Sequence, residues 1–143
     1  MRIVIMETGV EYQPKDKPIV RTAMDVLNVV GDLSVSDTEV FMVLTLDSKN
    51  GLHSADVITM GLLDSSLVDV RGVYRQAIIK NAAAIILCHN HPSGDLTPSR
   101  EDVRVTHQMA EAGRVLDIKL LDHVIVSKGK HLSLREEGLV TFS

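Results

Sequence analysis

Residues 82–105 have the sequence AAAIILCHNHPSGDLTPSREDVRV, and this stretch decides the fold class. Its first seven residues, Ala82 to Cys88, are small and aliphatic, which is typical of a central strand buried on both faces. The segment 89–98 carries Pro, Ser, Gly and Asp and is expected to form a loop. A helix is then predicted from about Ser99 to Ala112, with Gly113 as its end. A buried strand, a polar loop and a helix in this order indicate an α/β sheet protein.

The flanking segments extend this pattern. Val40 to Leu46 is apolar and rich in β-branched residues, and a second strand is expected at about Leu52 to Met60. Asn50-Gly51 lies between them and predicts a turn, so the two strands should form an antiparallel hairpin. The other predicted elements are a helix with apolar spacing at Val20, Met24, Leu27 and Val30 that ends at Gly31, a helix at about Val73 to Asn81, and strands at Ile118 to Val126 and His131 to Leu134.

Helices that alternate with strands predict an α/β fold, a three-layer α-β-α sandwich around a mixed sheet. The 143 residues are enough for one domain with its own core. We expect residues 1–17 to be a lead-in segment, irregular around Gln13 to Pro18, and residues 18–143 to form a single domain. The core should be aliphatic, because hydrophobic residues make up 45% of the chain and aromatic residues only 3%.

The overall charge argues against several classes of partner. The formal net charge is −4, whereas a nucleic-acid binder needs clustered Lys and Arg to neutralise phosphates. The apolar runs are too short for a membrane span, and no secretory signal opens the chain. Cys88 is the single cysteine and cannot form an internal disulfide, so we expect a protein of the reducing cytoplasm.

Chemistry is concentrated at the end of the predicted central strand. His89 and His91 are two residues apart, so on extended backbone their side chains point to the same side. Asp102 falls in the first turn of the next helix, where the loop can fold it back toward the imidazoles. Two imidazole nitrogens and one carboxylate oxygen suit Zn²⁺, and three protein ligands leave the fourth tetrahedral position open. This set predicts a catalytic zinc site with one ion per chain.

Structural alternatives exist for the same residues. A histidine is more often a surface residue or a hydrogen-bonded core residue than a ligand, although burying two imidazoles without partners would be costly. Ser99 and Asp102 have the spacing of a capping box, and an acidic residue suits the start of a helix. The capping role and the ligand role of Asp102 can coexist.

Two further residues are candidates for the chemistry. Hydrolysis with zinc-bound water needs a base that accepts a proton and passes it to the leaving group, and Glu39 stands at the edge of the first core strand. The alternative for Glu39 is a solvated strand end. Ser99 is placed to donate a hydrogen bond to the oxyanion that forms on the attacked carbonyl.

These residues resemble the motif of the JAMM (MPN-plus) metalloproteases, which is Glu, a long gap, His-x-His, seven residues, Ser, two residues and Asp. Ser99 lies eight residues after His91, and Asp102 eleven, so the spacing agrees. The longer pattern HNHPSGD…PSREDV, with Asp122-His123 downstream, is similar to the RadC branch of this family. The resemblance covers about residues 18 to 140.

The resemblance implies that His89, His91 and Asp102 bind zinc, that Glu39 is the general acid/base and that Ser99 steadies the oxyanion. It also implies an α-β-α sandwich similar to the cytidine-deaminase fold. This chain differs at Val70-Arg71-Gly72, where RadC proteins usually carry a Pro-Arg-Glu-like string. The helix-hairpin-helix segment of longer RadC proteins is not expected here.

Other polar residues near the motif have weaker cases. Asp95 is more typical of a turn than of a substrate contact, and Cys88 should face away from His89 into the core. His107 should lie on a different helix face from Asp102 and be exposed, because the two are five residues apart. His123 is expected either to support the site from behind a ligand or to have a structural role.

The sequence therefore predicts a zinc-dependent metallohydrolase, metalloprotease-like or isopeptidase-like, that acts on a protein or peptide substrate. The alternative is a non-catalytic interaction module linked to DNA repair or mobile-element functions, although all the metal ligands are retained. A zinc deaminase acting on nucleobases is excluded, because that class needs His-x-Glu and a Pro-Cys-x-x-Cys string, whereas position 91 is His. A homodimer through a sheet edge or a helix face is compatible with the aliphatic composition.

Overall fold

The predicted hairpin is part of the sheet in a computed structural model that describes residues 10–60 and 68–142. Strand β2 (Val40–Leu46) is buried along its whole length and pairs antiparallel with β3 (Leu52–Met60). The turn between them is held by Asp47, whose Oδ1 accepts hydrogen bonds from the backbone N–H groups of Lys49 and Gly51 at 2.9 and 2.8 Å. Both strands and their antiparallel pairing were predicted from the sequence, and the structure confirms them.

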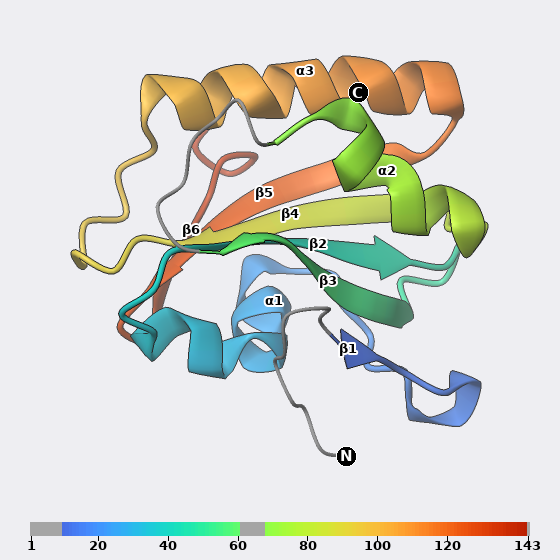
Figure 1. The fold of residues 1–143 in the computed structure, drawn as a ribbon, viewed down its shortest axis with the longest axis horizontal. Coiled ribbons are helices and arrows are strands. Elements are labelled where there is room, and N and C mark those ends of the chain that lie inside the picture. The colour runs from blue at the N-terminus through green and yellow to red at the C-terminus, as the bar shows by residue number, and fades with distance from the viewer. Residues whose placement is uncertain (1–9, 61–67, 143) are drawn as a thin grey trace.

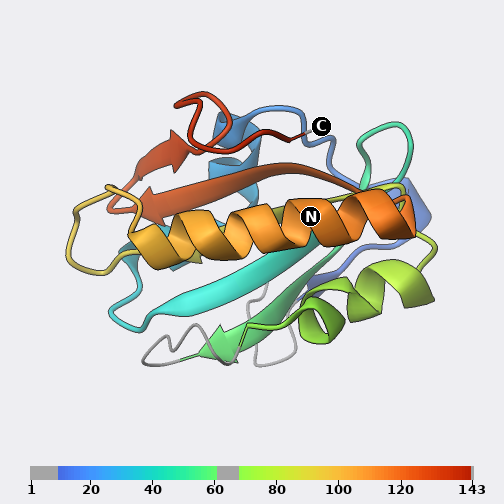
Figure 2. The same ribbon diagram turned by 90° about the horizontal axis from the view of Figure 1, so that it is seen from above.

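Within the described part of the chain, six strands form one mixed sheet in the order β1-β3-β2-β4-β5-β6. Strand β4 (Ala84–Asn90) pairs antiparallel with β2 and parallel with β5 (Lys119–Ser127), and β6 (Lys130–Ser133) closes one edge. Helices α2 (Val70–Ile79) and α3 (Arg100–Leu116) cover one face, and α1 (Ala23–Val29) covers the other (Figure 1). Figure 2 shows α3 lying across the middle of the sheet with α2 beside it. The predicted three-layer α-β-α sandwich is therefore confirmed.

The central strand lies two residues further along the chain than predicted. Asn81 adopts a left-handed conformation (φ 53°) after α2, and the Ala82 N–H then donates to the Ala77 carbonyl. The chain therefore enters the sheet only at Ala84, and β4 continues through His89 and Asn90, which pair with β5. As a result, the first histidine of the motif is part of the rigid sheet.

The first helix begins later than predicted and ends where predicted. Helix α1 begins after a capping box between Thr22 and Asp25 and ends before Gly31, which then begins a 3-10 helix, η2 (Gly31–Val35). Within the predicted lead-in, β1 (Val10–Glu11) pairs with β3, and η1 (Pro14–Asp16) follows. Among the described residues, no helix is long and apolar enough to span a membrane.

Helix α3 continues through Gly113, where its end was predicted, and runs three residues further to Leu116. A Cβ atom at this position would lie 2.5 Å from the Ile118 carbonyl oxygen and 2.5 Å from the Tyr74 hydroxyl. Gly113 is therefore required for the close approach of α3 to α2 and to the start of β5, and the helix ends instead at Asp117, which is left-handed (φ 58°).

Replacement of this glycine should destabilise the fold. We expect Gly113→Ala to lower the free energy of unfolding by about 1–3 kcal/mol, because the clash with a backbone carbonyl exceeds the gain in helix propensity. The matched control is Gly31→Ala, where a Cβ would meet nothing within 4 Å. Urea unfolding of both variants measures the difference, and equal stability of the two would contradict this account of Gly113.

Candidate metal centre

Three side chains converge where the carboxyl end of β4 meets the first turn of α3. The Nε2 atoms of His89 and His91 are 2.9 Å apart. The Asp102 carboxylate places Oδ1 3.3 Å from Nε2 of His89 and Oδ2 3.4 Å from Nε2 of His91. His89 is fully buried and Asp102 is only 7% exposed. The fold thus brings together the three residues for which the sequence predicts a ligand role.

Asp102 is held by the capping box at the start of α3. Ser99 Oγ accepts from the Asp102 N–H at 3.0 Å, and Asp102 Oδ2 accepts from the Ser99 N–H at 2.8 Å. This pair satisfies two backbone donors that the first turn of a helix leaves without intrahelical partners. The same bonds aim the Asp102 carboxylate at the imidazoles, so the capping role and the position facing the histidines coexist.

Glu39 approaches the two histidines from the start of β2. It is half-buried, and it offers a ligand atom within the same group as His89 and His91, whose offered atoms all lie within 4.8 Å of one another. Glu39, His89 and His91 therefore form one candidate metal-binding group, and the Asp102 carboxylate also faces both imidazoles.

The backbone on both sides of Glu39 is held by Asn90. The Asn90 side chain accepts from the Val40 N–H at 2.7 Å and donates to the Thr38 carbonyl at 2.8 Å and to the Ser36 carbonyl at 3.4 Å. Asn90 is only 1% exposed and extends β4 between the two histidines. One amide thus connects the strand that carries His89 to the segment that carries Glu39.

The outer nitrogen of each imidazole has its own partner. His91 Nδ1 lies 2.7 Å from the Asp95 carbonyl oxygen. His89 Nδ1 lies 2.8 Å from Nε2 of His123, and His123 Nδ1 lies 2.6 Å from the Thr106 hydroxyl. Metal-binding histidines commonly use the ring nitrogen away from the metal in this way.

The surroundings of Asp102, His91 and His123 shift the pKa values of all three side chains. Burial raises the pKa of the Asp102 carboxyl, but the adjacent His89 and His91 imidazoles, in their protonated forms, lower it by more, so the pKa lies well below its usual range. The Asp102 carboxylate in turn raises the pKa of His91 despite partial burial. Complete burial lowers the pKa of His123 well below its usual value, so this ring is neutral at neutral pH.

The aromatic ring of Phe41 packs against the inner imidazoles. It stacks on His89 with 5.7 Å between ring centroids and meets His123 edge-on at 5.7 Å. Phe41 is 2% exposed and pairs with His89 across β2 and β4. The site therefore has a wet side, where His91 is partly exposed, and a dry side built from Phe41 and His123.

Several residues singled out in the sequence lie where the pattern placed them. Cys88 is fully buried in the core on the α1 side of the sheet, and His107 is exposed. Asp95 forms a turn in which its carboxylate accepts from the Thr97 N–H, and only its backbone carbonyl contacts His91. Arg71 lies in the first turn of α2 with a side chain that is 93% exposed and that pairs with Asp69 at 3.7 Å.

Sequence reasoning missed two residues that support the site. Asn90 has no role among the predictions from sequence, although an amide next to a buried strand needs hydrogen-bond partners, which is a usable signal. Thr106 lies one helical turn after Asp102, and nothing in its local pattern distinguishes it from an ordinary helix residue.

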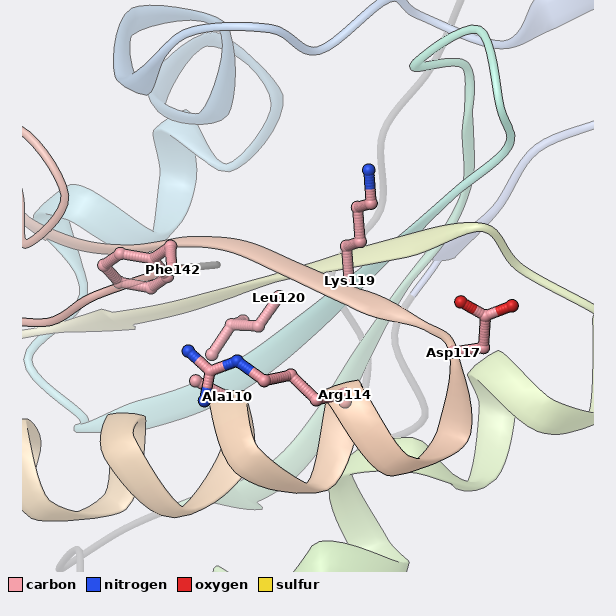
Figure 3. Close-up of a pocket in the computed structure, with 7 residues that line it drawn as sticks. Ala110, Arg114, Asp117, Lys119, Leu120 and Phe142 are labelled. Atoms are coloured by element: carbon pink, nitrogen blue, oxygen red, sulfur yellow. The ribbon is translucent and has the colours of Figure 1, made fainter.

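A cavity of about 230 Å³ lies elsewhere, beside the C-terminal half of α3 (Figure 3). Leu120 and Phe142 line it, and Arg114 lies along it while donating to the Thr141 carbonyl at 3.2 Å. Figure 3 shows Lys119 pointing to the other side of β5 from Leu120. The cavity begins about 12 Å along the helix from Asp102, so it is separate from the metal centre.

Two histidines at the carboxyl end of a central strand face a carboxylate in the first turn of the next helix. This arrangement in an α/β sandwich defines a candidate metalloprotein of the α/β class. The model of the RadC-like JAB domain matches residues 20–139, and the chain belongs to this family. The resemblance drawn from the sequence is therefore confirmed.

Relatives at 40–46% identity support the same assignment. A UPF0758 protein of Desulfitobacterium hafniense is 40% identical over 133 residues, which are 92% of this chain and 59% of the relative. One of Methanosarcina barkeri is 41% identical over 136 residues, 94% of this chain and 58% of the relative. One of Caldanaerobacter subterraneus is 46% identical over 119 residues, 82% of this chain and 51% of the relative. The chain thus spans between half and three fifths of the length of these relatives.

Loss of the Asn90 amide should destabilise the domain. We expect Asn90→Ala to lower the free energy of unfolding by about 1–3 kcal/mol, because the buried Val40 N–H and Thr38 carbonyl lose their partner. Asn90→Asp keeps the acceptor for the Val40 N–H but lacks the donor for the Thr38 carbonyl, so it should also lower the free energy of unfolding. Urea unfolding measures both, and a wild-type midpoint for Asn90→Ala would show that the amide does not hold this segment.

Proposed function

We propose that this chain is a zinc-dependent hydrolase that cleaves amide bonds of peptides or isopeptides. The proposed zinc ligands are His89 Nε2, His91 Nε2 and the Asp102 carboxylate. The observation that carries the proposal is the mutual separation of these atoms, 2.9 to 3.4 Å in a mostly buried site.

Such an arrangement is unfavourable without a cation. A carbonyl oxygen can only accept, so His91 Nδ1 donates its proton to the Asp95 carbonyl. In the neutral ring, His91 Nε2 then faces His89 and Asp102 with a lone pair. Crowding a lone pair against a buried carboxylate costs free energy unless a proton or a metal ion lies between them. The nitrogen and oxygen donors, and the absence of a thiolate among them, fit Zn²⁺ with an open fourth position.

The other residues have complementary roles in this proposal. Zinc bound here would polarise the scissile carbonyl and lower the pKa of an attacking water. Glu39 accepts a proton from that water and delivers it to the leaving nitrogen, so that one amide and one water give one carboxylic acid and one amine. Ser99 Oγ already accepts from the Asp102 N–H, and its own O–H donates to the carbonyl oxygen as negative charge develops there.

The substrate proposed is therefore a protein or peptide. The net charge of −4 gives no support for a nucleic-acid ligand. Assembly as a homodimer and residence in the cytoplasm stay predictions from composition.

Metal analysis tests the ligand set directly. We expect the purified wild-type protein to bind close to one zinc per chain, and His89→Ala and Asp102→Ala to bind little, because each removes one of three ligands. His107→Ala is the matched control, since this exposed histidine lies on α3 away from the site. Elemental analysis after dialysis gives the stoichiometry, and equal zinc in wild type, His89→Ala and Asp102→Ala would refute the site.

Replacement of Glu39 distinguishes two roles for this residue, a general base and a fourth metal ligand. We expect Glu39→Gln to keep zinc and to lose about 10²- to 10⁴-fold in hydrolysis, because the amide cannot take up a proton. Glu101→Gln, on an exposed residue that pairs with Arg104 at 2.9 Å, is the control and should match wild type. Hydrolysis is measured on a panel of fluorogenic peptide and isopeptide substrates.

Two outcomes would count against the Glu39 assignment or the enzyme. Loss of zinc in Glu39→Gln would make Glu39 a metal ligand instead of a base. Full zinc occupancy without hydrolysis of any substrate in the panel by the wild type would favour the non-catalytic interaction module.

A further inference from the structure

A buried chain of hydrogen bonds runs from the backbone of α3 to the outer nitrogen of His89. It starts at the Asp102 carbonyl, passes through the Thr106 hydroxyl and the His123 ring, and ends at His89 Nδ1, with separations of 2.6, 2.6 and 2.8 Å. Thr106, His123 and His89 are each fully buried. We propose that Thr106 and His123 are positioning residues that fix His89 as the tautomer protonated on Nδ1, which leaves the Nε2 lone pair for the metal ion.

Thr106 sets the direction in which the hydrogen bonds of this buried chain donate. Its hydroxyl has one proton, and one of its two partners is the carbonyl oxygen of Asp102, which can only accept. The hydroxyl proton therefore lies toward Asp102, and the hydroxyl oxygen faces His123 as an acceptor. A threonine hydroxyl that donates to the carbonyl four residues earlier is a recurrent arrangement in helices.

The proton positions of both rings follow from this. Since Thr106 Oγ1 accepts, the proton of the neutral His123 ring is on Nδ1, and His123 Nε2 has a lone pair. That lone pair lies 2.8 Å from His89 Nδ1, which must then carry the proton between them. His89 Nε2, 3.3 Å from the Asp102 carboxylate, is left as an acceptor.

The reverse arrangement is disfavoured by the same geometry. A His89 protonated on Nε2 would require a proton on His123 Nε2 and a donation from Thr106 to His123 Nδ1. The Thr106 oxygen would then face the Asp102 carbonyl oxygen at 2.6 Å with no proton between them. Phe41 packs against both rings, at 5.7 Å between ring centroids in each case.

These hydrogen bonds also couple two of the proposed ligands, Asp102 and His89. Asp102 and Thr106 are one turn apart on α3, so the helix that presents the Asp102 carboxylate also determines the tautomer of His89. The proposal rests on the proposed function for the identity of the metal, whereas the tautomer itself is a property of the metal-free protein.

The tautomer is tested by ¹⁵N NMR of histidine rings in the metal-free wild-type protein at mildly alkaline pH. The expected result is protonated Nδ1 and unprotonated Nε2 for both His89 and His123, assigned with the His89→Ala and His123→Gln variants. An Nε2-protonated His89 would overturn the proposal. This measurement needs neither zinc nor a substrate, so it decides the proposal even if the wild type binds no zinc, which would refute the proposed function alone.

The energetic role is tested by zinc affinity, measured by competition with a chromophoric chelator. Thr106→Val keeps the shape of the side chain but removes the hydroxyl, and we expect zinc binding to weaken about 10- to 100-fold. Thr106→Ser keeps a hydroxyl at this position, and we expect its zinc affinity to lie within about 3-fold of wild type. This change is smaller than the one expected when a supporting group is lost. Thr45→Val is the matched control, because Thr45 is also fully buried and its hydroxyl contacts Ser54 at 2.7 Å, at the end of β2 away from Glu39.

The variants separate a positioning role from a merely structural one. If the hydroxyl only stabilises the core, Thr106→Val and Thr45→Val lose unfolding free energy alike and both keep wild-type zinc affinity. Wild-type zinc affinity in Thr106→Val would therefore overturn the proposal, and weakened affinity in Thr106→Val that Thr106→Ser restores would support it.

Discussion

The centre of this protein depends on the convergence of atoms that repel one another unless positive charge lies between them. Two imidazole nitrogens and a carboxylate stand 2.9 to 3.4 Å apart in a mostly buried position. Ordinary core packing avoids such an arrangement, because buried polar groups are normally paired donor to acceptor. The fold maintains it by using rigid elements: the carboxyl end of β4 supplies His89, and the first turn of α3 supplies Asp102.

Much of the support for the site comes from backbone groups. The Asp102 carboxylate is aimed by the Ser99 N–H, the His91 ring by the Asp95 carbonyl, and the Thr106 hydroxyl by the Asp102 carbonyl. Backbone positions are set by secondary structure, so these contacts persist as long as α3 and the loop before it keep their conformation. This explains how a domain with few aromatic residues can hold several polar side chains in one place without a large network of charged groups.

The two sides of the site differ in access to water. Phe41 and His123 make the inner side dry, while His91 and Glu39 are only partly buried. A low local dielectric on the inner side strengthens the hydrogen bonds that hold His89, whereas the outer side is accessible to solvent. The difference between a rigid inner histidine and a more accessible outer one thus follows from the position of His89 inside β4 and of His91 just beyond it.

The sequence by itself determined the elements and the motif. The apolar runs at 40–46 and 82–88, the Asn50-Gly51 turn and the spacing of His89, His91 and Asp102 are local patterns, so they were predicted without knowledge of the fold. The tertiary structure decided what depends on distant neighbours. Gly113 continues a helix because Tyr74 and the Ile118 carbonyl approach it, Asn90 bridges to residues 36–40, and Thr106 reaches His123 from another element. Such partners are far apart along the chain, and only the packing of α3 on the sheet brings them within hydrogen-bond distance.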